Sequence, residues 1–333
     1  MPLIVVLVLI SIIAVICVGA PFGRPQETAE LNKNIDTNKE KISAATDIAA
    51  TSIGTNVKAT FTVSTGEINI AATDTSKTAT ISKSNWYTFL KKIVDADGNL
   101  NAVKTITFDN EVNAPENSSR LFYPLISSTN HALSELVSIN NVNNLNLLGV
   151  TNMESMFEEC RSLITLGAGL NNGGQSIITM KRMFANCKSL TGVGKFGWVY
   201  SVQTTEEMFY GCSSLVEFDM SGKNSVFMPW GHLKNYNKMF EGCTSLERFV
   251  PPDEVYWAQI DAVNINFMFK DCSSLRELKW ITMPPCSAPV GTTTGCVNLK
   301  KVALGGPTNI SFVTSLCRFG FVGGPRFVWI YSG

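Results

Sequence analysis

The side chains most able to carry chemistry in this sequence are nine cysteines and two histidines. No two cysteines are spaced as CxxC, so neither a zinc ribbon nor a thioredoxin-like redox pair is indicated. His131 and His232 lie roughly 100 residues apart, and neither has Cys, Asp or Glu at metal-ligand spacing. A phosphate-cradling glycine loop and a nucleophile elbow are also missing. The sequence therefore predicts no catalytic residue, no cofactor and no metal, and it favours a binding protein over an enzyme.

Six of the cysteines belong to a repeated segment. Five copies share the pattern Met-Phe, two residues, Cys, one residue, Ser-Leu, and a sixth copy keeps only the Cys and the Leu. Successive cysteines are 24 to 31 residues apart, a period typical of a solenoid in which each coil is one copy. The expected core positions are Met156, Phe157, Cys160, Leu163, Phe184, Cys187, Leu190, Phe209, Cys212, Leu215, Phe240, Cys243, Leu246, Phe269, Cys272, Leu275, Cys296 and Leu299.

Each copy has a simple physical interpretation. Glu154 to Glu159 favours a short helix that turns its Met and Phe inward, and Leu163 to Leu166 alternates as a strand. One copy cannot bury its own apolar face, whereas stacked copies share a continuous core. The recurring cysteines are then small apolar fillers with free thiols. Disulfides between copies are the alternative, and a bridge among Cys286, Cys296 and Cys317 stays open.

The repeated MFxxCxSLxxL motif resembles the BspA-like leucine-rich repeat surface proteins. The resemblance covers about half of the chain, residues 126–304 with the well-formed copies from residue 150 onward. It implies display outside the cell or at its surface, and binding to host or matrix proteins or to neighbouring cells.

The first 20 residues contain no charged side chain. As a helix they would rise about 30 Å, enough to cross a bilayer core. A membrane anchor and a retained secretory signal are two interpretations, although a signal would normally have a basic start. Residues 25–52 are polar with apolar residues at roughly helical spacing, which predicts an amphipathic continuation.

A third interpretation rests on Leu3, Ile4, the run Ile10 to Ile13, and Pro21, which resemble the N-terminal helix of type IV pilins. That resemblance implies identical subunits associating through this helix into an extracellular filament, with the helix in the membrane before assembly. The chain departs from the family at Val5, where the family usually has a glutamate.

The remaining sequence completes the predicted organisation. Residues 55–125 contain alternating segments and one amphipathic helix, which would make a small unit closing the first coil. Asn130 to Leu133 is read as a degenerate copy with Asn in the cysteine position. Residues 1–54 would form the N-terminal helix and residues 305–333 a C-terminal cap. The expected fold class is therefore α+β: a long helix, a small strand-plus-helix unit, and a leucine-rich repeat solenoid.

The surface is weakly charged and balanced. Lys plus Arg and Asp plus Glu number 27 each, so no basic field exists to attract nucleic acid. Two long segments between copies carry aromatic and imidazole side chains that either contact a ligand or pack on their own loops; these are Trp230, His232, Tyr256 and Trp257. Asn117 and Asn309 begin possible glycosylation sequons. The partner is an unnamed extracellular protein or glycan.

Overall fold

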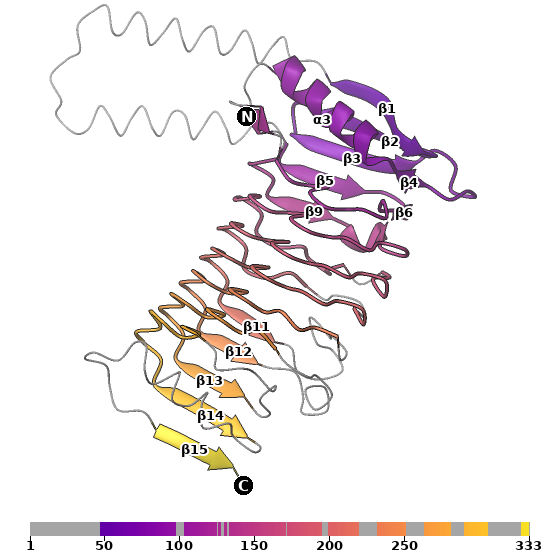
Figure 1. Cartoon of the computed structure of the whole chain (residues 1–333). Coiled ribbons are helices and arrows are strands. Elements are labelled where there is room, and N and C mark those ends of the chain that lie inside the picture. The colour runs from indigo at the N-terminus through magenta and orange to yellow at the C-terminus, as the bar shows by residue number, and fades with distance from the viewer. Residues whose placement is uncertain are drawn as a thin grey trace, which may run out of the picture. The chain divides into compact units, whose positions relative to one another are not determined.

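The computed structural model describes one unit of the chain, within Thr46–Gly333. Figure 1 shows this unit as a stack of coils that begins at a small sheet with one helix. The described residues are 47–97, 103–124, 126–127, 130–131, 133–170, 172–194, 199–219, 232–250, 263–280, 290–305 and 328–332.

Among the regular elements of these residues, strands far outnumber helices. The single α-helix among them is α3 (Lys83–Asp97), and one short 3₁₀ helix, η1 (Val142–Asn144), follows later. The strands are β1 (Ile48–Thr55), β2 (Val57–Thr62), β3 (Glu67–Ala72), β4 (Thr80–Ile81), β5 (Thr105–Phe108), β6 (Val112–Asn113), β7 (Ile126–Ser127), β8 (Asn130–His131), β9 (Ser138–Asn140), β10 (Leu145–Asn146), β11 (Glu217–Asp219), β12 (Arg248–Val250), β13 (Glu277–Trp280), β14 (Lys301–Gly305) and β15 (Val328–Ser332).

An eight-stranded sheet, in the order β10-β6-β4-β1-β2-β3-β5-β9, encloses the first coils. β1, β2 and β3 are antiparallel neighbours, whereas β5 and β9 continue from β3 in parallel, and β6 and β10 continue from β4 in parallel. The sheet therefore joins two sides of the stack around its end. Burial alternates along β2 as expected for a strand with one face in the core: Val57, Ala59 and Phe61 are buried, whereas Lys58 is exposed and Thr60 half-buried.

Helix α3 packs its apolar stripe against this end. Trp86, Phe89, Leu90 and Ile93 are all buried and follow the i, i+3, i+4, i+7 spacing of a helix face. The Trp86 indole N–H donates to the Leu121 carbonyl oxygen at 2.7 Å, so the ring is held against the first coil. Helix α3 therefore covers the apolar end of the stack, which would otherwise face water.

The coils stack in parallel register. Isolated bridges connect Asn152, Thr179, Thr204, Asn235 and Asn264 in succession along one side of the stack. In each of these residues the side-chain oxygen accepts the backbone N–H two residues on, at 2.8 to 3.2 Å. Asn and Thr favour such local turns, which explains why these residue types recur there.

On another side the coils form a five-stranded parallel sheet in the order β11-β12-β13-β14-β15. Successive coils supply successive strands, and the register pairs Phe218 with Phe249 and Phe249 with Leu278. Earlier coils continue this side through single bridges from Ser138 to Thr165 and from Thr165 to Gly192.

The expected α+β class with a long N-terminal helix is wrong. The described chain is a β-solenoid with a single α-helix of 15 residues. Residues 1–46 lie outside the described residues, and so do the helix residues Leu3, Ile4, Ile10, Ile13 and Pro21. Where the predicted helix of residues 25–52 reaches the described part, it is strand: β1 starts at Ile48 and pairs with β2 and β4.

The short helix expected at Glu154–Glu159 is also wrong. That segment is a pair of turns, because Ser155 has φ 57° and Glu159 has φ 65°. Left-handed residues cannot continue a right-handed helix. Every well-formed copy repeats both left-handed positions, one before Met-Phe and one before Cys. The position before Cys is held by Glu159, Asn186, Gly211, Gly242, Asp271 and Gly295.

Replacing Asp271 by Gly is expected to raise the free energy of unfolding by about 1 kcal/mol, because a left-handed non-glycine residue is strained. Its nearest charge partner, Lys270 Nζ, is 3.6 Å away and solvent-accessible, so little attraction is lost. Chemical denaturation measures the difference. The matched control is Gly242→Ala, where an added Cβ meets nothing closer than 3.5 Å. That variant should lose about 1 kcal/mol through φ alone, and a stabilised Gly242→Ala would contradict the assignment.

Candidate binding surface

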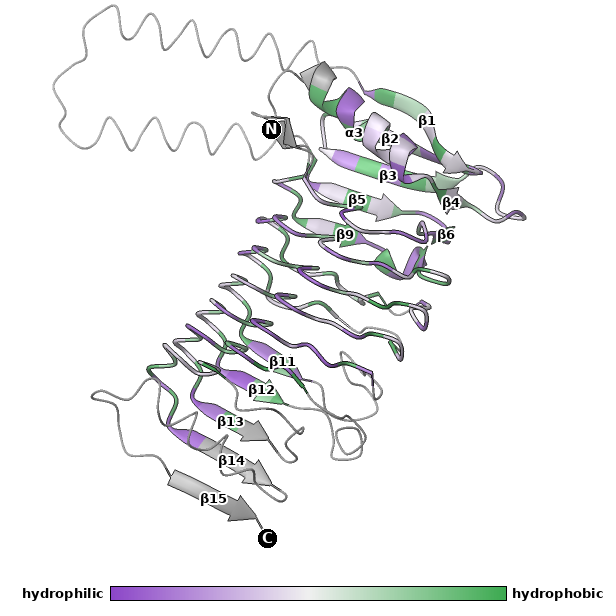
Figure 2. Cartoon of the chain, in the orientation of Figure 1, coloured by the Kyte–Doolittle hydropathy of each residue, from purple (hydrophilic) through white to green (hydrophobic). Residues whose placement is uncertain are grey.

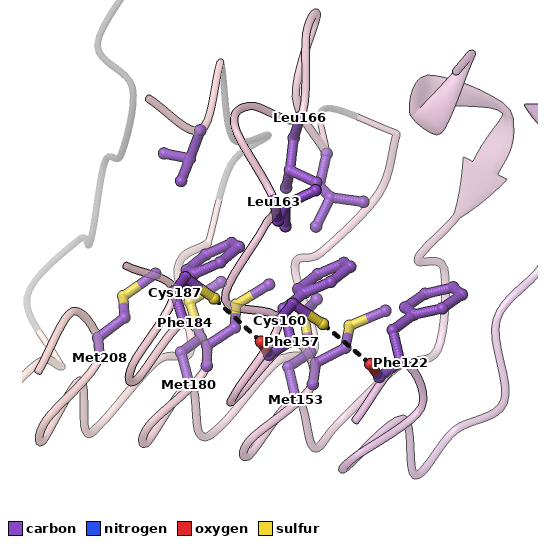
Figure 3. Close-up of a cluster of buried hydrophobic side chains, with 14 of the residues drawn as sticks. Phe122, Met153, Phe157, Cys160, Leu163, Leu166, Met180, Phe184, Cys187 and Met208 are labelled. Carbon is purple, nitrogen blue, oxygen red and sulfur yellow. Dashed lines mark hydrogen bonds between the residues drawn. The ribbon is translucent and has the colours of Figure 1, made fainter. Parts of the chain in front are cut away.

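The predicted repeat residues all lie inside the solenoid. Met156, Phe157, Cys160 and Leu163 are fully buried, and their counterparts in the later copies are at most 3% exposed. Figure 3 shows Phe122, Phe157 and Phe184 in one column and Met153, Met180 and Met208 in the adjoining coils. The interior is therefore filled by side chains of the repeat itself.

The cysteines form a hydrogen-bonded ladder. Each Cys thiol donates to the carbonyl oxygen of a Phe in the preceding coil, at 3.0 to 3.1 Å; the acceptors are Phe122, Phe157, Phe184, Phe209, Phe240 and Phe269. All six thiols in the described residues are free. Burial raises the pKa of each, to about 12 for Cys296. A neutral, buried thiol is a poor nucleophile, so the ladder is structural.

A stack of phenylalanine rings runs beside the thiols. Neighbouring rings from Phe122 to Phe269 lie 5.1 to 5.6 Å apart between centroids, with interplanar angles of 2° to 11°. The stack meets α3 at one end, where Trp86 contacts Phe122 edge-on. At the other end the sixth copy places buried Thr292 and Thr293 after its left-handed Gly291, where earlier copies have Met-Phe.

The sequence pattern missed part of the repeat. Four copies have a buried aliphatic residue six positions before the Met of Met-Phe: Val150, Ile177, Val202 and Leu233. A second buried column lies three positions before that Met, with Met153 and Met180 in the first two copies. The fixed offsets were visible in the sequence, but variable residue types concealed the second column. The Phe of the first coil was missed as well: Phe122 holds the Phe position, preceded by Leu121 in place of Met.

The degenerate copy is shifted by three residues from its predicted register. Ser138 bridges to Thr165 and Ile139 is buried, so Leu136 aligns with Leu163 and Leu133 takes the cysteine position. Asn130 instead belongs to β8 and pairs with Ser127. A leucine in the cysteine position still fills the core, which is why the motif alone did not reveal the register.

One outer edge of the coils carries a continuous ion-pair network. Arg182 pairs with Glu158 and Glu207, and Lys238 lies 3.9 Å from both Glu207 and Glu241. The hydrogen bond to Glu158, together with the nearby charges, raises the pKa of Arg182. The carboxylates of this network are only 9% to 16% exposed. These charges are therefore committed to holding coils together and leave little for a ligand.

The outer face of the parallel sheet is different. Glu217, Arg248, Glu277 and Lys301 are register partners on successive strands, and we call them the charge column. Their side chains are 40% to 59% exposed. Figure 2 shows hydrophilic colour at the starts of β11, β12, β13 and β14, one above the other. Arg248 pairs with Glu217, and Lys301 pairs with Glu277 at 2.8 Å.

A second exposed set lies one residue before the charge column. This corner column consists of Val216, Glu247, Arg276 and Lys300. Val216 is 48% exposed, and the Arg276 guanidinium lies 3.6 Å from Glu247. The two columns together make an ordered, solvent-facing surface on the last coils of the stack, and this surface is the candidate binding site.

Of the four ligand-contact residues expected from the sequence, one lies among the described residues. His232 is exposed at the start of a coil. Trp230, Tyr256 and Trp257 lie outside the described residues, as do Cys17, Cys286, Cys317 and Asn309. Asn117 is exposed, and its side-chain oxygen accepts the Ser119 backbone N–H at 3.1 Å.

Among the described residues, no helix is long and apolar enough to cross a membrane. Within the same residues, no group of three or more His, Cys, Asp or Glu side chains is placed to hold a metal ion.

Comparison with known proteins identifies one family model, described as "Mycoplasma protein of unknown function, DUF285". It matches residues 127–250 and again 179–280, together less than half of the 333 residues. Two overlapping matches to one model agree with a repeated unit. They fall on the copies recognised from the sequence.

No curated protein matches the chain. Among solved structures, a leucine-rich cell surface protein from Faecalibacterium prausnitzii is 13% identical, covering 76% of this chain and 88% of that one. Its TM-score is 0.17, too low to support an inference about fold or function. The resemblance of the first residues to type IV pilins receives no support from either match. The chain is thus similar, over its repeats, to a family without an assigned function.

Proposed function

We propose that this protein is a non-polymerising, membrane-anchored surface adhesin that uses its solenoid as a binding scaffold. The observation that carries the proposal is that the solenoid buries its apolar repeat residues inside and presents charged side chains on its outer face. Columns of Phe, Met, Leu and Cys fill the inside of the described coils, with Leu or Thr in some of these positions in the first and sixth coils. The sheet exterior presents charged side chains at the regular spacing of its strands, about 4.8 Å. Such a surface suits recognition of another macromolecule better than turnover of a small substrate.

The arrangement of chemistry-bearing groups supports binding over catalysis. The six thiols of the described residues are protonated and enclosed, and the His232 imidazole is exposed at the start of a coil. A nucleophile needs a neighbouring base and an oriented third group. The partner we propose is therefore an extracellular protein or glycan, without nucleic acid or cofactor.

Anchoring is proposed from composition alone. The first 20 residues carry no charge, and a segment of that length and apolarity is sufficient for a membrane span. The BspA-like resemblance of the repeats is consistent with display on the outer side.

Labelling of intact cells with a membrane-impermeant amine reagent tests this placement. The protein is expected in the membrane fraction and labelled without lysis. A variant with Ile10→Lys and Ile13→Asp should leave the membrane fraction, since charged residues in the centre of a span cost about 2.5–3.5 kcal/mol each. Recovery of the unaltered protein in the soluble cytosolic fraction, unlabelled until lysis, would overturn the proposal.

A further inference from the structure

The order of the charge signs in the charge column is more regular than its two intrachain ion pairs require. Read along the stack, its signs alternate: Glu217 negative, Arg248 positive, Glu277 negative, Lys301 positive. Uncharged residues bound it on both sides, since Gly192 bridges the preceding coil's Thr165 and Lys301 pairs in register with Val328. A run of alternating charges with an even number of members is complementary to the same run read in the opposite direction.

We propose that the charge column is a homotypic docking surface, on which a second copy of this chain binds face to face. The inference rests on the proposed function as a binding scaffold and names its partner. The two-fold axis lies parallel to the strands, so the second copy presents the column in reverse order. Glu217 then faces Lys301 of the second copy, and Arg248 faces Glu277 of the second copy.

The corner column also meets opposite or uncharged residues when its order is reversed. Reversal sets Glu247 against Arg276 of the second copy, and Val216 against Lys300 of the second copy. No like charges meet in either column. The other possible two-fold axis, parallel to the stack, would place every charge opposite its own counterpart. Like charges directly opposed cost several kcal/mol at an interface, so the pattern selects a single orientation.

Symmetry and exposure both favour this partner. Homo-oligomers are most often two-fold dimers whose interface is self-complementary, and a fixed alternating pattern satisfies that condition without a conformational change. The four side chains remain 40% to 59% exposed despite pairing within the chain. The edge network, by contrast, has its carboxylates nearly enclosed. Exposed charged groups can exchange an intrachain partner for an interchain partner at low cost.

The decisive variant inverts all four signs at once: Glu217→Lys, Arg248→Glu, Glu277→Lys and Lys301→Glu. Neighbouring strands still carry opposite charges, so the intrachain ion pairs are kept with their signs exchanged. Of the ion pairs that position 248 makes within 4.0 Å, the one with Asp219, at 3.9 Å and solvent-exposed, becomes like-charged. Along the chain, positions 247–248 and 276–277 also become adjacent like charges, at sites where solvent keeps the cost small. The inverted chain should therefore melt near the temperature of the unaltered chain, and it should still pair with itself.

Mixed association then distinguishes docking from intrachain stability. Full-length protein in detergent is labelled at its C-terminus with a donor or an acceptor fluorophore, and energy transfer is measured on mixing. We expect transfer within the unaltered chain and within the inverted chain. Between the two, association should fall by about tenfold or more, because all four facing pairs of the charge column become like-charged while the corner column stays as it was. A second variant that swaps Lys181 and Glu206 on a different side keeps normal mixing and serves as the control.

Equal transfer in homotypic and mixed samples would overturn the inference, since association through any other surface ignores the column's sign. Unaltered protein that stays monomeric at high micromolar concentration would overturn it equally. Neither result bears on surface display, which impermeant labelling reports separately. If the protein is not displayed on the cell surface but its pairing still depends on the signs of the charge column, the proposed function fails and the docking inference stands.

Discussion

Raising the pH from about 9 to about 10 is expected to remove about 6–7 kcal/mol from the free energy of unfolding, because each of six buried thiols loses about 1.0–1.2 kcal/mol. The thiols of Cys160, Cys187, Cys212, Cys243, Cys272 and Cys296 are held neutral by burial, which raises their pKa values in the folded chain.

The sign follows from the direction of these shifts. Below the unfolded pKa, near 8.5 to 9, folded and unfolded thiols are both protonated and stability does not depend on them. Above it, the unfolded chain releases protons that the folded chain retains, so unfolding becomes progressively easier up to the folded pKa. For Cys296 that upper limit is about 12. A domain with a typical 5–15 kcal/mol of stability should therefore unfold near pH 10.

Denaturant titrations between pH 7.5 and 10.5, under reducing conditions, measure this slope. Cys212→Ser removes one titrating group and keeps a hydroxyl able to donate to the Phe184 carbonyl oxygen, which now accepts from the thiol at 3.0 Å. Its slope should be shallower by about 1.4 kcal/mol per pH unit. Stability that is constant from pH 8 to 10 would mean that the thiols are exposed or oxidised.

Phe209→Ala is expected to lower the free energy of unfolding by about 3–5 kcal/mol. The ring is fully buried and stacks on Phe184 at 5.4 Å and on Phe240 at 5.5 Å. Its loss creates a cavity and removes two stacking contacts at once, each worth about 0.5–1.5 kcal/mol. Because each coil contacts only its neighbours, the flanking coils cannot collapse into the gap without breaking their own register. Leu215→Ala, in the same coil, should cost about 2–5 kcal/mol.

The control lies next to Leu215. Val216 belongs to the same coil but is 48% exposed, so Val216→Ala should change stability by less than about 0.5 kcal/mol. Equilibrium denaturation of the three variants gives the comparison. A loss below 1 kcal/mol for Phe209→Ala would place the ring outside a packed stack.

How far the sequence predicts this structure depends on whether a feature repeats at fixed spacing. Phe157, Cys160 and Leu163 recur with identical offsets, so their burial could be predicted without coordinates. The helix at Glu154–Glu159 could not be excluded in this way, because nothing in the residue types requires φ above zero at Ser155 or Glu159. The recurrence of Gly at positions 211, 242 and 295 was the available signal for a left-handed residue before each Cys.

The strand β1 illustrates a second limit. Ile48 and Ala49 fit the apolar spacing of an amphipathic helix, but tertiary pairing with β2 and β4 makes this segment a strand. The charge column shows a third limit. Glu217 and Arg248 are separated by 31 positions, and the inserted segments between copies differ in length. Only the register of the parallel sheet shows that these two side chains face the same way in adjacent strands.

The central claim is that the repeats form one continuous core with the six cysteines inside it. Alkylation of the native, reduced protein followed by peptide mass spectrometry tests this claim most directly. Peptides containing Cys160, Cys187, Cys212, Cys243, Cys272 and Cys296 should stay unmodified in buffer and become modified together when denaturant unfolds the chain. Rapid modification of Cys187, Cys212 or Cys243 in the native protein, at the rate of a free thiol, would contradict the stacked core.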